Sequence, residues 1–304
     1  MGVSDSIYCH EFGSQNTEIK LGIVKQYLKL YTKALRGKFR NLIYIDAFAG
    51  TGERTVRVKN HDGDLIDEAV PEHLEQYKGS AQIALDIRPA FDKLIFMDIK
   101  PSHIAALEEL RKHNPNRDIV ILQGDANNLL KYTLNKVNWG CSRAVMFLDP
   151  YGMSVYWDTL RIIARTKAID VWYLFSLSGL YRQAARNRDN IDEHKKAAIT
   201  KMLGTDSWLE ELYVKKTDYD LFGSVDTVYQ RNMDVQGLET YVKKRLEILF
   251  PYVIDPIPLP IDKKPQRFSL FFTVSNNSLK ATQLANRFAN YILSEGKSSH
   301  KRSR

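Results

Sequence analysis

Four acidic residues stand at the ends of four successive short apolar runs, and together they could bind a nucleoside-type ligand. They are Asp46, Asp98, Asp125 and Asp149. Carboxylates accept hydrogen bonds from ribose hydroxyls and from amino groups, and they favour a cationic group nearby. One such acid is ordinary, whereas four in this order are hard to explain by stability alone. The series therefore predicts a ligand site along the carboxyl edge of a sheet.

The first acid opens a glycine loop with the pattern Asp-x-Phe-x-Gly-x-Gly. Its candidate cofactor contacts are Asp46, Phe48, Ala49, Gly50 and Gly52. Phe48 replaces the first glycine of a dinucleotide fingerprint, and the Gly-Lys-Ser or Gly-Lys-Thr of a phosphate loop is absent. These departures favour S-adenosylmethionine (SAM), which carries adenosine without phosphate. A plain glycine-rich turn is the alternative.

The second and third acids would hold the adenosine end of the same cofactor. Asp98, followed by Ile99, would accept hydrogen bonds from the ribose hydroxyls. Asp125 would accept one from the adenine amino group, while the Ala126 amide meets a ring nitrogen. Each acid also has a simpler interpretation, because Asp caps helices well. Asp98 could be a solvent-exposed cap, and Asp125 taken singly is better explained as one.

These acids need strands and helices that bring them to one edge. The apolar runs, each four to seven residues long, are Leu42–Ile45, Leu94–Met97, Ile119–Leu122, Ala144–Leu148 and Ile169–Phe175. The intervening helices are predicted over Ser80–Ile87, Ser102–His113, Ala126–Lys136 and Trp157–Thr166. Uniformly apolar strands that alternate with helices indicate a parallel sheet covered on both faces. The predicted class is α/β, a doubly wound, mostly parallel Rossmann-like sheet.

The remainder of the chain predicts additions to this sheet. Tyr252–Ile257 and Phe268–Val274 are predicted closing strands, the latter antiparallel, and Arg186–Leu203 and Leu238–Phe250 are predicted helices. Residues 1–40 form an N-terminal helical segment, with a helix over Glu18–Leu35 capped by Thr17. Residues 41–275 form the main domain, with inserts at about 53–78 and 204–237. Residues 276–304 form a helix and a basic tail, of which Lys297–Arg304 is expected to be disordered.

Two features of this plan have open interpretations. The insert at 53–78 follows the carboxyl end of a strand, so it could be a lid over the ligand or a surface loop. Arg182, Arg186 and Arg188 lie just downstream of Tyr181 and could contact phosphates, although a solvated helix face is the favoured interpretation.

The composition of the chain limits the classes of protein to which it could belong. The chain has 304 residues, 44% of them hydrophobic and 26% charged, and a net charge of +8. No apolar run suits a membrane span or a signal peptide, so a cytoplasmic protein is expected. The positive charge is compatible with RNA or DNA as partner.

Metal chemistry is not expected from the sequence. Cys9 and Cys141 cannot form a zinc cluster or a disulfide framework by themselves. Four scattered histidines, His61, His73, His103 and His113, lack the paired spacing of metal ligands.

The order of these motifs resembles that of the class I SAM-dependent methyltransferases. The loop "DAFAGTG" resembles the glycine loop of nucleic-acid amino methyltransferases. The segment "DPYG" resembles their Asp-Pro-Pro-Tyr motif and the Asp-Pro-Phe-Gly of tRNA guanine-N2 dimethyltransferases. Together "YIDAFAGTG", "KGSAQIAL" and "VMFLDPYG" are similar to the three-Cys-motif partner proteins, over roughly residues 17–275. The resemblance implies SAM as cofactor and a radical-SAM-like three-Cys-motif protein as partner.

The resemblance also implies roles for the fourth acid and its neighbours. Asp149 and the Pro150 carbonyl would accept hydrogen bonds from an exocyclic base amine, and Tyr151 would stack on the flipped base. The second proline of the motif is absent, and Gly152 stands where the ring would be. The target atom is therefore open, and the simpler interpretation remains a strand that ends in a turn. Methylation of a protein or small molecule, and a non-catalytic SAM-binding subunit, are the alternatives.

Overall fold

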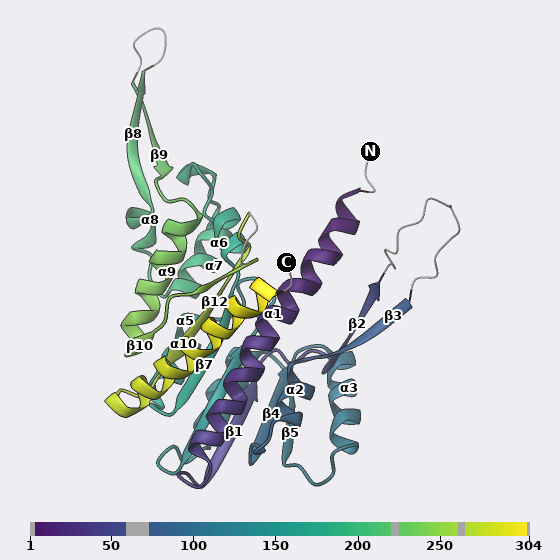
Figure 1. Ribbon diagram of the computed structural model, residues 1–304. Coiled ribbons are helices and arrows are strands. Elements are labelled where there is room, and N and C mark those ends of the chain that lie inside the picture. The colour runs from purple at the N-terminus through teal and green to yellow at the C-terminus, as the bar shows by residue number, and fades with distance from the viewer. Residues whose placement is uncertain (1–3, 59–72, 220–224, 261–264, 303–304) are drawn as a thin grey trace, which may run out of the picture. The chain divides into compact units, whose positions relative to one another are not determined.

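The computed structural model describes residues 4–58, 73–219, 225–260 and 265–302 (Figure 1). The chain divides into two compact units, Met1–Gly124 and Asp125–Arg304.

Unit 1 holds three parallel strands with the helices that connect them. In chain order its elements are α1 (Ser4–Leu35), β1 (Asn41–Asp46), β2 (Glu53–Val58), β3 (His73–Lys78), α2 (Ser80–Asp86), β4 (Lys93–Asp98), α3 (Pro101–Lys112) and β5 (Ile119–Gln123). β1 pairs with β4 and β4 with β5, both in parallel. Their carboxyl ends therefore lie at one edge, where Asp46, Asp98 and Gly124 follow each other across the sheet.

Strands β1 and β4 of unit 1 are apolar and buried on both faces. Leu42, Tyr44 and Ile45 on β1, and Leu94 and Phe96 on β4, have no exposed surface. This agrees with the uniformly apolar runs that predicted a covered parallel sheet.

Helix α1 begins earlier than the sequence suggested. The predicted start at Glu18, with Thr17 as cap, is wrong because Thr17 lies inside a helix that begins at Ser4. Once a helix is nucleated, each further residue adds a hydrogen bond, so a capping residue type need not end it. Beyond the other end of α1, Arg36 pairs with Asp92 at 2.6 Å, and Asp92 also accepts from the Leu42 N–H at 2.7 Å. These bonds tie the helix to the first strand.

The insert between β1 and α2 is a hairpin. β2 and β3 pair antiparallel from Glu53↔Lys78 to Val58↔His73. The lid interpretation concerns mainly residues 59–72, which include His61 and lie outside the described residues, so it stays a prediction. At its base, the Gly79 N–H donates to the Gly52 carbonyl at 2.8 Å. The hairpin thus leaves and rejoins the sheet beside the glycine loop.

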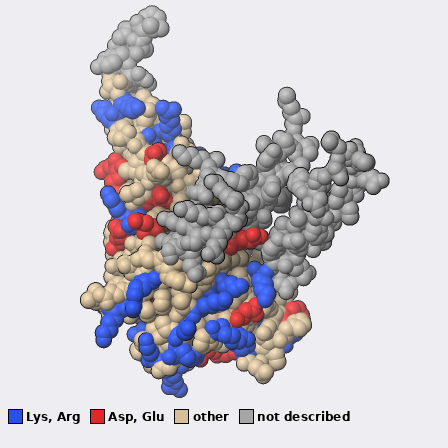
Figure 2. Space-filling model, viewed as in Figure 1, with Lys and Arg blue, Asp and Glu red and all other residues tan. Residues whose placement is uncertain are grey.

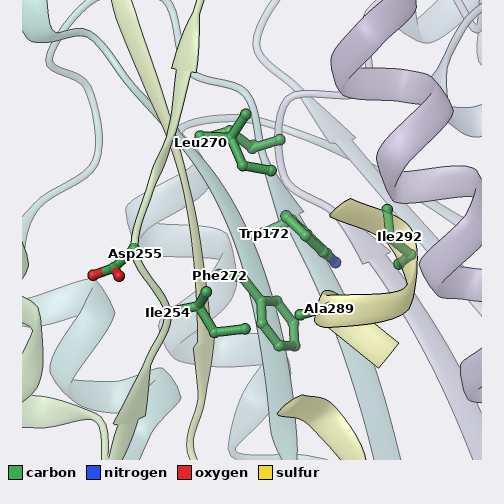
Figure 3. A pocket seen from close by; sticks show the side chains of 8 residues that line it. Trp172, Ile254, Asp255, Leu270, Phe272, Ala289 and Ile292 are labelled. Carbon is green, nitrogen blue, oxygen red and sulfur yellow. The ribbon is translucent and has the colours of Figure 1, made fainter. Parts of the chain in front are cut away.

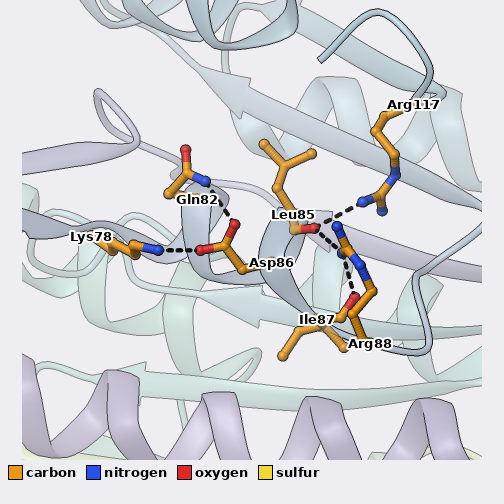
Figure 4. A network of polar contacts seen from close by, with 7 residues as sticks. All are labelled: Lys78, Gln82, Leu85, Asp86, Ile87, Arg88 and Arg117. Carbon is orange, nitrogen blue, oxygen red and sulfur yellow. Dashed lines mark hydrogen bonds and ion pairs between the residues drawn. The ribbon is translucent and has the colours of Figure 1, made fainter. Parts of the chain in front are cut away.

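Side chains around α2 fix this hairpin and the far end of the helix (Figure 4). Lys78 pairs with Asp86 at 2.5 Å, and Gln82 donates to the same carboxylate at 2.9 Å. Arg88 and Arg117 each donate to the Leu85 carbonyl at 2.8 Å. Helix carbonyls at a carboxyl end lack backbone partners, so these guanidinium groups supply the missing donors.

Unit 2 contains the remaining strands. In chain order its elements are α4 (Ala126–Leu134), β6 (Ser142–Leu148), α5 (Trp157–Arg165), β7 (Ile169–Phe175), α6 (Leu177–Gln183), the 3-10 helix η1 (Arg188–Asn190), α7 (Glu193–Leu203), α8 (Trp208–Glu211), β8 (Tyr213–Tyr219), β9 (Val225–Arg231), α9 (Val235–Leu249), β10 (Tyr252–Val253), β11 (Ile257–Leu259), β12 (Phe268–Val274) and α10 (Leu279–Arg302). β6 and β7 are parallel, whereas β12 is antiparallel to β7, and β10 and β11 pair with β12. The predicted antiparallel C-terminal strand is confirmed.

Helices cover both faces of this sheet. Trp172 on β7 lies opposite Phe272 on β12, and both face Ala289 and Ile292 of α10 across a hollow of about 10 Å³ (Figure 3). That volume holds about one water molecule, so the hollow is a small gap in the packing between the sheet and α10 and not a ligand pocket. On the alternate face of β12, Ser269 donates to Glu239 of α9 at 2.6 Å. The α/β class with a mostly parallel, Rossmann-like sheet is therefore confirmed.

Three segments of unit 2 differ from expectation or resolve an ambiguity. The single helix predicted over Arg186–Leu203 is wrong, because Asp192 accepts from the Lys195 N–H and caps a separate α7. The second insert contains α8 and a β8–β9 hairpin. Helix α10 continues to Arg302, so most of the tail expected to be disordered is helical. The domain boundaries at 40/41 and 275/276 stay predictions.

None of the described helices combines the length and the apolarity that crossing a bilayer would require.

Candidate cofactor and substrate site

The glycine loop of unit 1 is shaped for a close approach. Gly50 and Gly52 have φ of +63° and +77°, which side-chain-bearing residues rarely adopt. A Cβ on Gly50 would meet nothing within 4 Å, whereas one on Gly52 would lie 3.2 Å from Leu110 of α3. Gly50 therefore faces open space, and Gly52 packs beneath a helix. The Ala49 N–H donates to the Met97 carbonyl at 2.9 Å, which fixes the loop against β4.

Asp46 shapes this loop from within. Its side chain is fully buried. One carboxylate oxygen accepts from the Phe48 N–H at 3.2 Å, and the other lies 3.3 Å from the Tyr44 hydroxyl. The predicted cofactor contact of Asp46 stays a prediction, and the bonds that the structure records for it hold the turn.

Asp98 joins the glycine loop to the start of α3. It is 4% exposed and accepts from the Gly50 N–H at 3.1 Å and the Lys100 N–H at 2.9 Å, while His103 Nδ1 lies 3.0 Å away. Burial alone would raise the pKa of this carboxyl, but the bonds from Lys100, His103 and Gly50 outweigh it and lower the pKa. The interpretation as a solvent-exposed cap is wrong, because Asp98 is buried and Lys100 occupies the N-cap position.

Two groups beside Asp98 bear on cofactor binding. A carboxylate offers about four lone-pair sites, and three recorded donors leave room for one more. Ile99 is 61% exposed, so it offers apolar surface next to the acid. Sequence reasoning missed the contact of His103, although its position one turn into the helix after an acid was a usable signal.

In unit 2, Asp125 is the cap of α4. Its carboxylate accepts from the Asn128 N–H at 3.1 Å, so the capping interpretation is confirmed. Ala126 is the first residue of the helix, where a backbone N–H has no intrahelical acceptor. The predicted contacts of both residues with adenine stay predictions.

Asn127 connects α4 to the loop that carries the fourth acid. Its side chain is 8% exposed and donates to the Ser154 carbonyl at 2.9 Å. Its carbonyl oxygen accepts from the Tyr156 N–H at 3.0 Å and from the Thr159 hydroxyl at 2.7 Å. Sequence reasoning assigned this residue no role. The available signal was an amide side chain two residues after the helix cap Asp125.

The fourth acid lies at the end of β6, in a loop that displays a ring. Asp149 is half-buried and Pro150 is buried, whereas Tyr151 is 61% exposed. Gly152 has φ +65°, and the Ser154 hydroxyl donates back to the Tyr151 carbonyl. The strand does end in a tight turn, and that turn presents an acid and an aromatic ring together.

The structure brings the predicted residues together in two sets. Unit 1 joins the glycine loop to Asp98, and unit 2 joins the cap of α4 to the Asp149 loop through Asn127. Among the residues whose side chains are described, no group of three or more His, Cys, Asp or Glu could hold a metal ion. His61 lies outside the described residues.

The comparisons with known proteins give only distant matches, all among solved structures. No family model and no curated protein sequence matches the chain. Protein LPL1258 of Legionella pneumophila is 13% identical, with a TM-score of 0.42, over 85% of this chain and 96% of that one. A SAM-dependent methyltransferase of Clostridium acetobutylicum is 10% identical, with a TM-score of 0.34, over 82% and 91%. The N-terminal domain of EvdMO1 with SAH bound is also 10% identical, with a TM-score of 0.37, over 82% and 79%.

The chain is thus distantly similar in structure to proteins that include SAM-dependent methyltransferases. Each TM-score lies below 0.5. The function of the chain is therefore inferred from its own residues.

Proposed function

We propose that the protein is a SAM-dependent methyltransferase that methylates an exocyclic amine of a nucleic-acid base. The observation that carries this proposal is the loop after β6, where Asp149 and Pro150 are followed by an exposed Tyr151. Tyr151 stands two residues after the acid, so this strand end displays an exposed ring close in sequence to a carboxylate. A flat base could stack on the ring and donate its amine to the acid.

The described residues fit a nucleoside cofactor without phosphate. Gly50 opens onto free space, so a ligand could approach the backbone closely. Asp98 retains room to accept a ribose hydroxyl, and Ile99 would contact the adenine face. SAM would supply a methyl group on an already activated sulfonium. The protein's own contribution would be binding and orientation.

The substrate side would act by orienting the acceptor nitrogen. Its lone pair is delocalised into the base, which makes the amine a poor nucleophile. Hydrogen bonds to Asp149 and to the Pro150 carbonyl would direct that lone pair at the methyl group. The nitrogen–carbon bond forms as the sulfur–carbon bond breaks, and the electron pair of the broken bond stays on sulfur. The surplus amine proton leaves to the Asp149 carboxylate or to water.

Other functions remain consistent with the same site. Methyl transfer to a protein or a small molecule would use the same cofactor residues. The similarity of three motifs to three-Cys-motif partner proteins favours a further candidate. In that case the chain would be a member of that family and would serve a radical-SAM-like three-Cys-motif protein as a SAM-binding subunit.

Transfer of a labelled methyl group from SAM into total RNA, DNA and protein separates these functions. We expect label in RNA or DNA, on a base nitrogen after hydrolysis to nucleosides. Label in protein alone would support the second function, and transfer only after addition of the three-Cys-motif protein the third. Calorimetry with SAM tests their common premise. No binding, with or without nucleic acid, would exclude all three.

A further inference from the structure

The β8–β9 hairpin of unit 2 gathers cations and tyrosines on one of its faces. Tyr213 lies opposite Arg231, and Lys215 lies opposite Tyr229. Directly opposed residues of an antiparallel pair share a face, and so do residues two positions apart. These four side chains therefore lie on one face of the hairpin. Lys216, one residue along, points to the other.

Two arginines stack on tyrosine rings at this face. The Arg188 guanidinium lies 3.6 Å from the centre of the Tyr229 ring, and that of Arg231 lies 3.8 Å from the centre of the Tyr181 ring. Arg231 also donates to the Tyr181 carbonyl at 3.0 Å. A guanidinium placed over a ring in this way can keep its edge N–H groups available for other acceptors. We name Tyr181, Arg188, Lys215, Tyr229 and Arg231 the Arg–Tyr face.

The base of the hairpin is anchored rigidly. Tyr213 is 4% exposed, and its hydroxyl donates to the Ala185 carbonyl at 2.7 Å. The Arg231 N–H donates to the Arg186 carbonyl at 2.8 Å. Burial raises the pKa of Tyr213 to about 12 in spite of the nearby Arg231 and Arg188, so this ring stays neutral at physiological pH. The arginines are therefore pre-organised before any partner arrives.

The positive charge of this region is not neutralised internally. Arg182, Arg186, Lys215 and Lys216 are exposed, and none of them, nor Arg188 or Arg231, has an ion pair among the described residues. Figure 2 shows Lys and Arg side chains on the β8–β9 arm. Guanidinium forks and ammonium groups beside partly exposed rings are suited to a phosphodiester backbone with unpaired bases.

We propose that the Arg–Tyr face binds the backbone of a single-stranded nucleic acid. Helix α6, which carries Tyr181 of this face, also approaches the loop that follows β6. A Cβ on Gly179 of this helix would lie 3.5 Å from Met153 of the loop, so helix and loop are in contact. This placement rests on the proposed function, because a strand held here would run beside the ring that stacks the target base. An acidic protein is the competing partner, and the rings favour nucleic acid over it.

Adjacent lysines of β8 provide a matched test. We expect the full chain to bind fluorescent single-stranded RNA or DNA of one sequence, and Lys215→Ala to weaken binding by about three- to tenfold. The same variant should reduce the steepness of the salt dependence by about 0.7, one phosphate contact on a single strand. Lys216→Ala makes the same change on the opposite face and should alter affinity by less than about twofold. Arg188→Lys, which keeps the charge but loses the planar stack, should also weaken binding.

The outcomes either support the face or overturn it. Equal effects of Lys215→Ala and Lys216→Ala, or no binding at low salt, would overturn the proposal. If polyglutamate at equal charge displaced the oligonucleotide, the partner of the Arg–Tyr face would be an acidic protein and not a nucleic acid. Comparison of the affinities for the RNA and the DNA oligonucleotide shows which of the two nucleic acids the face prefers.

The result is separable from that of the methyl-transfer assay. Binding that depends on Lys215, without methyl transfer, would leave the Arg–Tyr face standing and remove the proposed reaction. If Lys215→Ala transferred methyl groups to nucleic acid with full activity and bound it with full affinity, the proposed reaction would stand and the Arg–Tyr face would be removed. Calorimetry with SAM should give the same affinity for both lysine variants.

Discussion

The glycine loop of unit 1 and the Asp149 loop of unit 2 differ in how deeply their acids are buried. In unit 1, Asp46 is fully buried and Asp98 is 4% exposed, and both carboxylates accept bonds from neighbouring groups of the chain. In unit 2, Asp149 is half-buried beside an exposed Tyr151, and the loop is held by a different residue, Asn127. Acids at strand ends in this protein therefore differ in burial and in their surroundings.

The difference separates residues that shape a site from residues that present a group. Buried acids set the backbone of the glycine loop, so their loss should act through stability and cofactor affinity. The Asp149 loop is held by the Asn127 amide, and under the proposed function its acid and ring would contact the substrate. Four changes test this division.

Asp149→Ala should lower methyl transfer by about 100- to 1000-fold, because the acceptor amine loses its orienting bond. SAM affinity and the unfolding midpoint should change little. Single-turnover rates with labelled SAM, together with calorimetry, measure the two quantities. Full activity of this variant would remove the substrate role of the loop, and an equal loss of SAM affinity would move Asp149 to the cofactor side.

Gly79→Ala should disrupt the glycine loop by steric clash. The new Cβ would lie 2.7 Å from the Gly52 carbonyl oxygen, and backbone cannot move aside as a flexible side chain can. We expect a loss of about 1–3 kcal/mol in the free energy of unfolding and weaker SAM binding. Urea denaturation measures the first.

Gly22→Ala is the control for this change. A Cβ there would meet nothing within 4 Å in the exposed middle of α1, so it should stabilise by up to about 1 kcal/mol. If both alanines have the same effect, the close approach of Gly79 to Gly52 is not the cause.

Asn127→Ala should loosen the Asp149 loop without removing any of its residues. The change leaves the Ser154 carbonyl and the Tyr156 N–H without their partner, at a cost of about 1–3 kcal/mol. Transfer rate should fall more than SAM affinity, and amide exchange should quicken across 151–156. The exposed neighbour Asn128→Ala keeps its backbone bond to Asp125 and should stay within about 0.5 kcal/mol of the parent. Unchanged amide exchange would show that other contacts hold the loop.

Asp98 should make stability depend on pH in acid. Its pKa in the folded state lies below the unfolded value of 3.8, so its stabilisation is present above that pH. The contribution is lost as the pH falls through the lowered folded pKa. The difference in unfolding free energy between parent and Asp98→Asn should therefore shrink below about pH 4. A difference that stays constant from pH 6 to pH 3, a range chosen to span about one unit or more on each side, would contradict the lowered pKa.

Much of the fold could be predicted because its signals are local. Apolar runs of a few residues mark the core strands, and helical periodicity marks α2 to α5, each within one or two residues of the observed bounds. The split at Asp192 was missed because charged residues are periodic on either side of it. The β8–β9 hairpin was missed since its exposed face carries no apolar alternation.

The sequence alone shows which residue types stand at the strand ends: glycines that tolerate positive φ, four acids and a tyrosine. It could not determine which acids point inward, because that depends on donors distant in the chain. Gly50 reaches Asp98 across 48 residues, and Asn127 reaches Ser154 across 27. Only the tertiary structure decided these pairings, since a buried carboxylate or amide takes the donors that packing brings to it.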